Sequence, residues 1–316
     1  MSLATTAVVF EQPGCLALTE LDLAVPGRDD CVVDIEWSGI STGTERLLWL
    51  GQMPDFPGMG YPLVPGYESV GRVSSAGEAT GLTEGQRVFV PGSRGFDGVR
   101  GLFGGAAARV VVPADRLVPL GEAFAEEGVL LALAATAHHA LAVSGQPVLP
   151  ELIVGHGVLG RLIARLVIAL DGEPPTVWET NPTRRGDDQG YPVVDPAADS
   201  RSDYRVVCDV SGNGTIFDQL ITRLAHGGLI VLAGFYEQPV SFAFPPAFLR
   251  EARLQIAAEW RPYDLQRVMH LLEVGRLSLD GLITHRESPV HAAAAYHTAF
   301  DDADCLKMIL DWRASQ

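Results

Sequence analysis

Short apolar or alternating runs fill residues 1–120 and are separated by Gly, Pro and Asp. Alternation of apolar and polar residues with a period of two is typical of strands. Together with the frequent turn residues, it predicts a twisted, barrel-like β unit. The strands that this pattern predicts are residues 7–10, 32–37, 69–74, 87–90 and 108–112.

The pattern changes in the middle of the chain. A continuous apolar run at 152–154, typical of a buried parallel strand, leads into 158–170, where apolar residues recur at helical spacing. Further strands are predicted at 176–178, 193–194, 205–210, 229–233 and 254–258, and helices at 216–224 and 264–274. This alternation indicates a doubly wound α/β sheet. We therefore predict a β-rich domain of residues 1–121 and 277–316, and an α/β domain of residues 122–276.

A glycine-rich segment follows the buried strand at 152–154 and opens the next helix. It consists of Gly155, His156, Gly157, Val158, Leu159 and Gly160. Three glycines at this spacing allow a tight turn, close approach of a pyrophosphate to the backbone, and close packing of helix on strand. The helix N-terminus offers free N–H groups to the phosphates. We predict dinucleotide binding here; the alternative is a purely structural turn.

The second strand of the α/β domain ends in an acidic residue, Glu179, which lies 19 residues beyond Gly160. A carboxylate at this place accepts hydrogen bonds from the ribose hydroxyls and repels a 2′-phosphate, so the sequence favours NAD over NADP. Arg184 and Arg185 are the competing signal, since they could bind a 2′-phosphate or be solvated loop charges. We also count Asn181 and Gly234 among the expected cofactor contacts.

The formal net charge of −16 repels phosphates and anionic lipid, so nucleic acid and membrane surfaces are not expected partners. The four cysteines form no C-x-x-C pair, and no secretory signal opens the chain. The most apolar of the long stretches, residues 128–143, is too short to span a bilayer. We therefore expect a cytoplasmic protein without an integral membrane segment.

Several segments resemble the medium-chain dehydrogenase/reductase superfamily: Gly-Tyr-Glu at 66–68, and the segments 134–141, 232–236, 282–285 and 305–310. The resemblance implies a GroES-like β-rich catalytic domain joined to a Rossmann domain. It also implies that Thr136 lies near the nicotinamide and that Lys307 faces the pyrophosphate.

The chain departs from the zinc-dependent members of that superfamily at their ligand positions. It has Tyr67 where they have His, Ser41 where they have Cys, and no donor at 133–135. The four clustered cysteines of their structural zinc lobe are also absent. A catalytic zinc normally takes three protein ligands, so we predict that the chain binds no metal.

The loss of zinc leaves the substrate proton to side chains. Tyr67 ranks first, because a phenol in a former ligand position can donate a hydrogen bond to a substrate oxygen or pass a proton. Its ordinary pKa of about 10 is high for a base, and a nearby nicotinamide cation would lower it. Ser41 and Thr42 follow, then Thr44 and His138. Packing of Tyr67 in a pocket wall, and of His138 in a helix, remain the alternatives.

Within the superfamily, the segments 37–49, 56–73, 100–109, 152–162 and 242–248 resemble the dehydrogenases of bacteriochlorophyll synthesis. This implies NAD-dependent oxidation of a hydroxyethyl substituent on a tetrapyrrole to an acetyl group. The apolar residues that could line a cleft for the macrocycle are Trp49, Met53, Phe56, Met59, Tyr61, Phe244 and Phe248. A zinc-free quinone or enone reductase and a non-catalytic NAD-binding redox sensor are the alternatives, and a homo-oligomer is possible.

Overall fold

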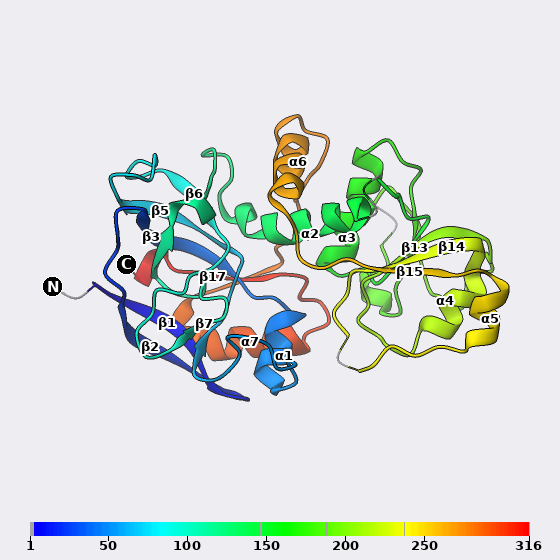
Figure 1. Ribbon diagram of the computed structural model, residues 1–316, viewed down its shortest axis with the longest axis horizontal. Coiled ribbons are helices and arrows are strands. Elements are labelled where there is room, and N and C mark those ends of the chain that lie inside the picture. Colours follow the sequence, from blue (N-terminus) through cyan, green and yellow to red (C-terminus); the bar gives the residue numbers. More distant parts are fainter. Residues whose placement is uncertain (1–2, 144, 146, 187–188, 237, 316) are drawn as a thin grey trace. The chain divides into compact units, whose positions relative to one another are not determined.

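The computed structural model describes residues 3–143, 145, 147–186, 189–236 and 238–315, and the chain forms two compact units (Figure 1). Unit 1 comprises Met1–Ala132 and Asp280–Gln316, and unit 2 comprises Leu133–Leu279. The sequence pattern places the boundaries after residues 121 and 276, so both observed boundaries lie farther along the chain. The C-terminal tail belongs to the same unit as the N-terminal residues.

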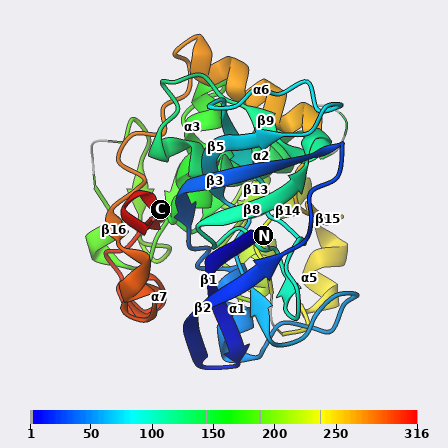
Figure 2. The same ribbon diagram turned by 90° about the vertical axis from the view of Figure 1, so that its left-hand side faces the viewer.

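Unit 1 contains two sheets, with strand orders β2-β1-β4-β7 and β16-β17-β3-β5-β6-β9, and β8 pairs with β3 (Figure 2). Its strands are β1 (Leu3–Gln12), β2 (Cys15–Leu23), β3 (Asp30–Gly39), β4 (Leu63–Val64), β5 (Ser69–Ala76), β6 (Arg87–Val90), β7 (Arg100–Gly101), β8 (Arg109–Pro113), β9 (Val118–Pro119), β16 (His285–Glu287) and β17 (Met308–Asp311). Its helices are α1 (Thr44–Leu50) and α7 (Ala292–Asp301).

Strand β3 is central to unit 1, because it pairs with β5, β8 and β17. Its register with β5 pairs Ser38 with Ser69, and its register with β17 pairs Gly39 with Ile309. The residues that follow β3, precede β5 and precede β17 therefore meet at one end of the sheet. These three segments carry Ser41, Tyr67 and Lys307.

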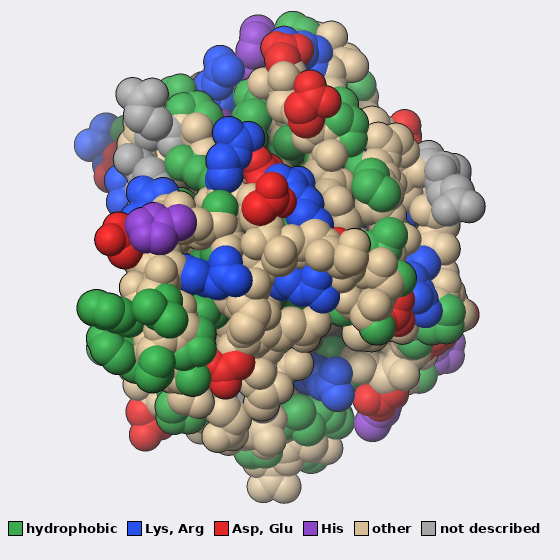
Figure 3. All heavy atoms as spheres, turned by 90° about the vertical axis from the view of Figure 1, so that its right-hand side faces the viewer, with side chains coloured by type: hydrophobic (Ala, Val, Ile, Leu, Met, Phe, Trp, Pro, Cys, Tyr) green, Lys and Arg blue, Asp and Glu red, His purple; other side chains and the backbone are tan. Residues whose placement is uncertain are grey.

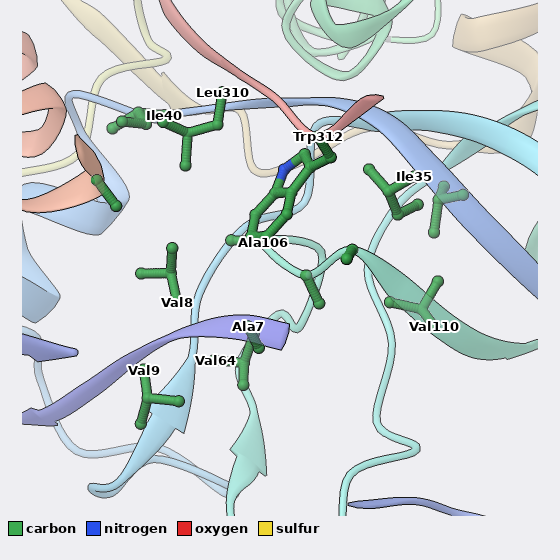
Figure 4. Packing of buried hydrophobic residues seen from close by; sticks show 14 of the residues in the cluster. Ala7, Val8, Val9, Ile35, Ile40, Val64, Ala106, Val110, Leu310 and Trp312 are labelled. Atoms are coloured by element: carbon green, nitrogen blue, oxygen red, sulfur yellow. The ribbon is translucent and has the colours of Figure 1, made fainter. Parts of the chain in front are cut away.

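The core of unit 1 is a continuous apolar cluster. Trp312 is fully buried and lies among Ile35, Ala106 and Leu310 (Figure 4). Its indole N–H donates to Ser38 Oγ at 2.9 Å, so the one polar atom of the ring is satisfied. Burying a large apolar side chain stabilises the fold by about 1.5–3 kcal/mol. This packing fixes the end of β17 against β3.

Unit 2 is a six-stranded parallel sheet with the order β12-β11-β10-β13-β14-β15. Its strands are β10 (Leu152–Val154), β11 (Thr176–Trp178), β12 (Val193–Val194), β13 (Tyr204–Asp209), β14 (Leu224–Leu232) and β15 (Arg253–Ile256). Its helices are α3 (Val158–Ala169), α4 (Phe217–Arg223), α5 (Phe244–Leu249) and α6 (Pro262–Glu273), and α2 (Leu131–Ala142) begins at the boundary of the units. The predicted combination of a GroES-like unit and a Rossmann unit is confirmed. Among the described residues, every helix is too short or too polar to cross a bilayer.

Several elements have no clear signal in the sequence pattern. Helix α1 spans only two turns and ends at Leu50, where the next residue, Gly51, caps it in a left-handed conformation with φ +68°. Helix α5 places Pro in its first turn, where the missing N–H costs nothing, although a Pro pair there suggests a loop. Strand β14 begins at Leu224, directly after α4 and well before residue 229, where the sequence pattern predicts the strand; its pairing with β13 shifts register between Tyr204 and Val206.

Candidate functional site

Unit 1 brings three hydroxyl side chains together at the end of β3. Ser41 Oγ and Tyr67 OH lie 2.6 Å apart, and Thr44 is a further hydrogen-bond partner of the phenol. We call Ser41, Thr44 and Tyr67 the hydroxyl cluster. Thr42, also a proton-transfer candidate, is exposed in the turn between β3 and α1. The register of β3 with β5 explains why residues 26 positions apart in the sequence meet here.

The phenol of Tyr67 is held in its protonated form. Burial raises its pKa above the ordinary value, and the negative charge of Glu68 adds to this effect. The ring packs edge-on against Phe103, with centroids 5.2 Å apart. The protein's own groups therefore favour a hydrogen-bonding phenol over a phenolate base, and the lowering effect of a nicotinamide cation stays a prediction.

Glu68 and Lys307 form a buried ion pair. Lys307 Nζ donates to Glu68 Oε2 at 2.6 Å and to the carbonyl of Ile40 at 3.1 Å, and both charged side chains are almost fully buried. Lys307 was expected to face the cofactor pyrophosphate, and this contact corrects that expectation. The physical reason is the buried carboxylate, which requires a cation at hydrogen-bonding distance.

A second buried carboxylate in this region has no assigned role in the sequence interpretation. Glu45 Oε1 accepts from the backbone N–H of Ser41 at 3.1 Å, and Oε2 accepts from the hydroxyl of Tyr296 at 2.7 Å. Burial is the main reason that the pKa of Glu45 rises to about 7. The sequence signal that could have pointed to Glu45 is its position directly after Thr44, one of the proton-transfer candidates.

The donors of this region do not suit a metal ion. The part of the chain that the structure describes contains no group of three His, Cys, Asp or Glu side chains that could hold one. Glu68 is engaged by Lys307, and the two former ligand positions carry Ser41 and Tyr67. Protein zinc sites require three or four Cys, His or carboxylate ligands, so the residues present do not fit a catalytic zinc. Metal independence itself remains a prediction.

In unit 2 the glycine-rich segment has the geometry that a dinucleotide requires. A Cβ at Gly160 would lie 1.9 Å from the carbonyl oxygen of Gly155, so only glycine allows this close packing. A Cβ at Gly157 would meet no atom within 4 Å, so the backbone there borders open space into which a pyrophosphate could approach. Helix α3 begins with Val158, which is buried, and Leu159, which is partly buried. The residues therefore fit a dinucleotide.

The side chain of His156 holds the glycine-rich segment in place through two contacts inside unit 2. Its ring is fully buried, with Nδ1 2.7 Å from the carbonyl oxygen of Arg184 and Nε2 3.0 Å from the hydroxyl of Tyr191. Burial lowers the pKa of His156 to about 4, so the imidazole is neutral. His156 is among the cofactor residues that the sequence predicts. Both nitrogens of its imidazole contact groups of unit 2, so the side chain supports the loop from inside.

Glu179 lies beside the same loop. Its carboxylate accepts hydrogen bonds from the backbone N–H groups of His156 at 3.2 Å and Asn181 at 2.8 Å. The nearby Arg185 pairs with Asp195 at 3.1 Å. Negative charge therefore adjoins the glycine-rich segment, while one of the two competing arginines is engaged elsewhere.

The remaining cofactor candidates lie at separate places in unit 2. Gly234 follows β14, and its backbone N–H donates to the carbonyl of Asp209 at 3.1 Å. Arg184 ends a short 3₁₀ turn, Pro182–Arg184, which Asn181 caps through its side chain. Thr136 is half-buried on α2.

The proton-transfer candidate His138 is part of a different arrangement. Nδ1 of His138 and Nδ1 of His139 lie 2.8 and 2.9 Å from the two carboxylate oxygens of Asp264. Asp264 also accepts from the backbone N–H of Arg261 at the start of α6. These buried contacts tie α2 to α6 within unit 2 and give His138 a structural role.

Four substrate-pocket candidates of unit 1 pack on its core. Met53 belongs to the buried cluster, and Trp49 lies edge-on to Phe10 with centroids 5.6 Å apart. Met59 and Tyr61 are partly buried against the same cluster, and the Tyr61 hydroxyl donates to the carbonyl of Leu48. Phe56 is exposed. Met53 is therefore a correction, because apolar packing places it in the core and not on an open surface.

Phe244 and Phe248, the two candidates in unit 2, are exposed on α5. They line an open groove of about 460 Å³ together with Phe242, Leu249 and Leu254. Figure 3, which views the end of the molecule that carries α5, shows hydrophobic side chains gathered at one side of this face. We call the exposed apolar residues of α5 and β15 the α5–β15 patch; they are Phe244, Phe248, Leu249, Leu254 and Ile256.

Comparison with known proteins agrees with both units. A family model described as the alcohol dehydrogenase GroES-like domain matches residues 27–122. The chain is 58% identical to 2-desacetyl-2-hydroxyethyl bacteriochlorophyllide A dehydrogenases of Rhodobacter capsulatus and Cereibacter sphaeroides; each match covers 98% of this chain, and 98% and 99% of the relatives. L-idonate 5-dehydrogenase of Escherichia coli is similar in fold, with a TM-score of 0.86 and 20% identity over 98% of this chain and 99% of that one.

Proposed function

The chain belongs to the family of the 2-desacetyl-2-hydroxyethyl bacteriochlorophyllide A dehydrogenases, and we propose that it oxidises the hydroxyethyl substituent of a bacteriochlorophyllide to an acetyl group with NAD⁺. The observation that carries this proposal is 58% identity over nearly the whole length of two such enzymes. In the reaction, the substrate carbon loses a hydride, its hydroxyl loses a proton, and the product is a ketone. NAD⁺ supplies the hydride acceptor when bound.

The hydroxyl cluster of unit 1 is proposed to manage the proton. Either oxygen of the Ser41–Tyr67 pair can be the donor at 2.6 Å, so Tyr67 can take up the substrate proton while it gives its own proton to Ser41, which releases a proton to water. A phenolate, which burial and Glu68 disfavour, is then not required. The first proton acceptor is thus proposed to be Tyr67, with Ser41 as its hydrogen-bond partner.

Unit 2 is proposed to hold NAD in preference to NADP. The open space over Gly157 can admit the pyrophosphate, and the carboxylate of Glu179, which contacts the same loop, is proposed to accept hydrogen bonds from the ribose hydroxyls. A 2′-phosphate there would meet a negative charge, and Arg185 already pairs with Asp195. This arrangement supports NAD.

The α5–β15 patch supports the expectation of a homo-oligomer, with a second copy of this chain as the occupant. Strand β15 is one of the two edge strands of the six-stranded sheet, and Ile256 on it is 73% exposed. A long apolar edge exposed to water promotes uncontrolled association unless it is covered. Antiparallel pairing of β15 with its own copy about a two-fold axis would satisfy the edge and bury the same patch on both chains.

The test of the proposed reaction is spectroscopic. Purified protein is mixed with NAD⁺ and the hydroxyethyl pigment, and we expect one NADH for each acetyl product, whose conjugated carbonyl shifts the pigment absorption to the red. NAD binding without turnover would favour the redox sensor. NADPH-dependent reduction of a quinone or enone would favour the reductase.

The same preparation tests metal independence by elemental analysis, where we expect no stoichiometric zinc. One tightly bound zinc per chain, with activity lost on its removal, would overturn this part of the proposal.

All four cysteines are free thiols, which supports a reducing compartment and the cytoplasm as the place of the reaction.

A further inference from the structure

Glu45, a buried carboxylate that has no part in the proposed reaction so far, contacts Ser41 of the hydroxyl cluster. Glu45 is fully buried in the first turn of α1, one residue after Thr44. Its Oε1 accepts the backbone N–H of Ser41, and the hydroxyl of the same Ser41 contacts Tyr67. One residue therefore connects the carboxylate to the phenol.

The other oxygen of Glu45 is fixed by a residue from the C-terminal part of unit 1. Tyr296 on α7 donates to Oε2 at 2.7 Å, and its ring is held edge-on to Phe10 at 5.2 Å. The charged groups that act on Glu45 are Glu68, which disfavours its ionisation, and Lys307, which favours it. Burial outweighs these contributions, so Glu45 gains its charge near neutral pH.

We propose that Glu45 is a positioning residue, which fixes Ser41 in the hydroxyl cluster and whose negative charge promotes uptake of the substrate proton by that cluster. The inference rests on the proposed function, because it concerns the same oxidation. A negative charge beside a hydroxyl raises its affinity for a proton, and Glu45 contributes to the raised pKa of Tyr67. Oxidation should therefore slow as pH falls through about 7 and Glu45 becomes neutral.

Glu45→Gln separates charge from geometry. The amide oxygen can still accept from the Ser41 N–H, and the amide nitrogen can donate to the Tyr296 oxygen, so the contacts persist without the charge. We expect the single-turnover rate at about pH 8 to fall about tenfold, the equivalent of one pKa unit, with little change in KM. The decline of the rate below about pH 7 should also disappear. A variant with the rate and pH profile of the wild type would overturn the proposal.

Tyr296→Phe tests the same link from the other side. Loss of the donated hydrogen bond raises the pKa of Glu45, so the decline in rate should move to higher pH. The matched control is Tyr204→Phe in unit 2, which removes a partly buried hydrogen bond of the same kind, from the buried Tyr204 to Asp199 at 2.7 Å. The control should leave the pH profile in place. An unmoved profile in Tyr296→Phe would count against the proposal.

A measurement without substrate distinguishes failure of this inference from failure of the proposed function. A carboxyl with a raised folded-state pKa binds more protons folded than unfolded between about pH 4.5 and about pH 7, so its contribution to stability falls as pH rises across that window. The Tm of Glu45→Gln relative to wild type should therefore increase from about pH 5 to about pH 8. A constant Tm difference would refute the ionisation of Glu45. A pigment that is not oxidised would refute only the function on which the inference rests.

Discussion

The buried pair of Lys307 and Glu68 can be tested by removing only its cation. Lys307→Met keeps an unbranched apolar chain in the same space but leaves Glu68 as an uncompensated buried carboxylate. Glu68 is fully buried, its Oε2 contacts Nζ at 2.6 Å, and its Oε1 has no hydrogen-bond partner among the described residues. With no other partner to take over, breaking the pair should cost about 3–5 kcal/mol in the free energy of unfolding.

The assay is urea unfolding of the full chain, followed by hydrogen exchange at peptides that contain β3 and β17, because these strands adjoin the pair. Lys307→Met, Glu68→Gln and the double variant complete a mutant cycle. The double variant should lose much less stability than the sum of the two single losses, since no buried charge is left unpaired.

The matched control is Arg28→Met, which breaks the exposed pair of Arg28 with Glu78 at 3.4 Å. Ion pairs in water contribute little, so this variant should unfold nearly as the wild type does. A loss below about 1 kcal/mol in Lys307→Met, as for a surface pair, or strictly additive losses in the cycle, would refute the reasoning.

Three further predictions concern the proton, the cofactor and the assembly. Tyr67→Phe keeps the contact with Phe103 but should lower the single-turnover rate by about a hundredfold or more; retention of about half the rate would remove Tyr67 from the mechanism. Glu179→Ala should weaken NAD binding by about 1–3 kcal/mol and relax discrimination against NADP, measured by calorimetry; equal affinities of the native protein for NAD and NADP would contradict this. Ile256→Asp should convert a dimer to a monomer in light scattering, and a monomeric wild type would rule out the proposed interface.

The sequence pattern was sufficient for elements whose signal is local. Residues 87–90 and 176–178 are strands with the bounds that the sequence pattern predicts, because the short apolar runs that mark them are local features of the chain. The glycine-rich segment was also predictable, since the geometry at Gly160 needs only the strand before it and the helix after it. Two-turn helices such as α1 offer too few residues for a period to be detected.

The pairings of the candidate site were not predictable in the same way. Lys307 and Glu68 are 239 residues apart, and Tyr296 and Glu45 are 251 apart, so their contacts follow from the register of β17 on β3 and the placement of α7. A resemblance could assign Lys307 to a pyrophosphate, because a lysine is a suitable phosphate ligand in any exposed setting. Only the structure, in which Lys307 is buried beside the carboxylate of Glu68, shows that Glu68 is its partner.

The charges near the hydroxyl cluster connect these findings. Glu68 and Lys307 are a buried pair of opposite charge at 2.6 Å, so together they add no formal charge to this end of unit 1. The formal charge there is then set by Glu45, which has its pKa near 7 and contacts Ser41 directly. In a zinc enzyme the metal would fix a positive charge at the reacting oxygen. Here we propose that a carboxylate that ionises near neutrality sets the proton affinity of the hydroxyl cluster instead, and the pH profile of oxidation should show a single ionisation on its acidic side.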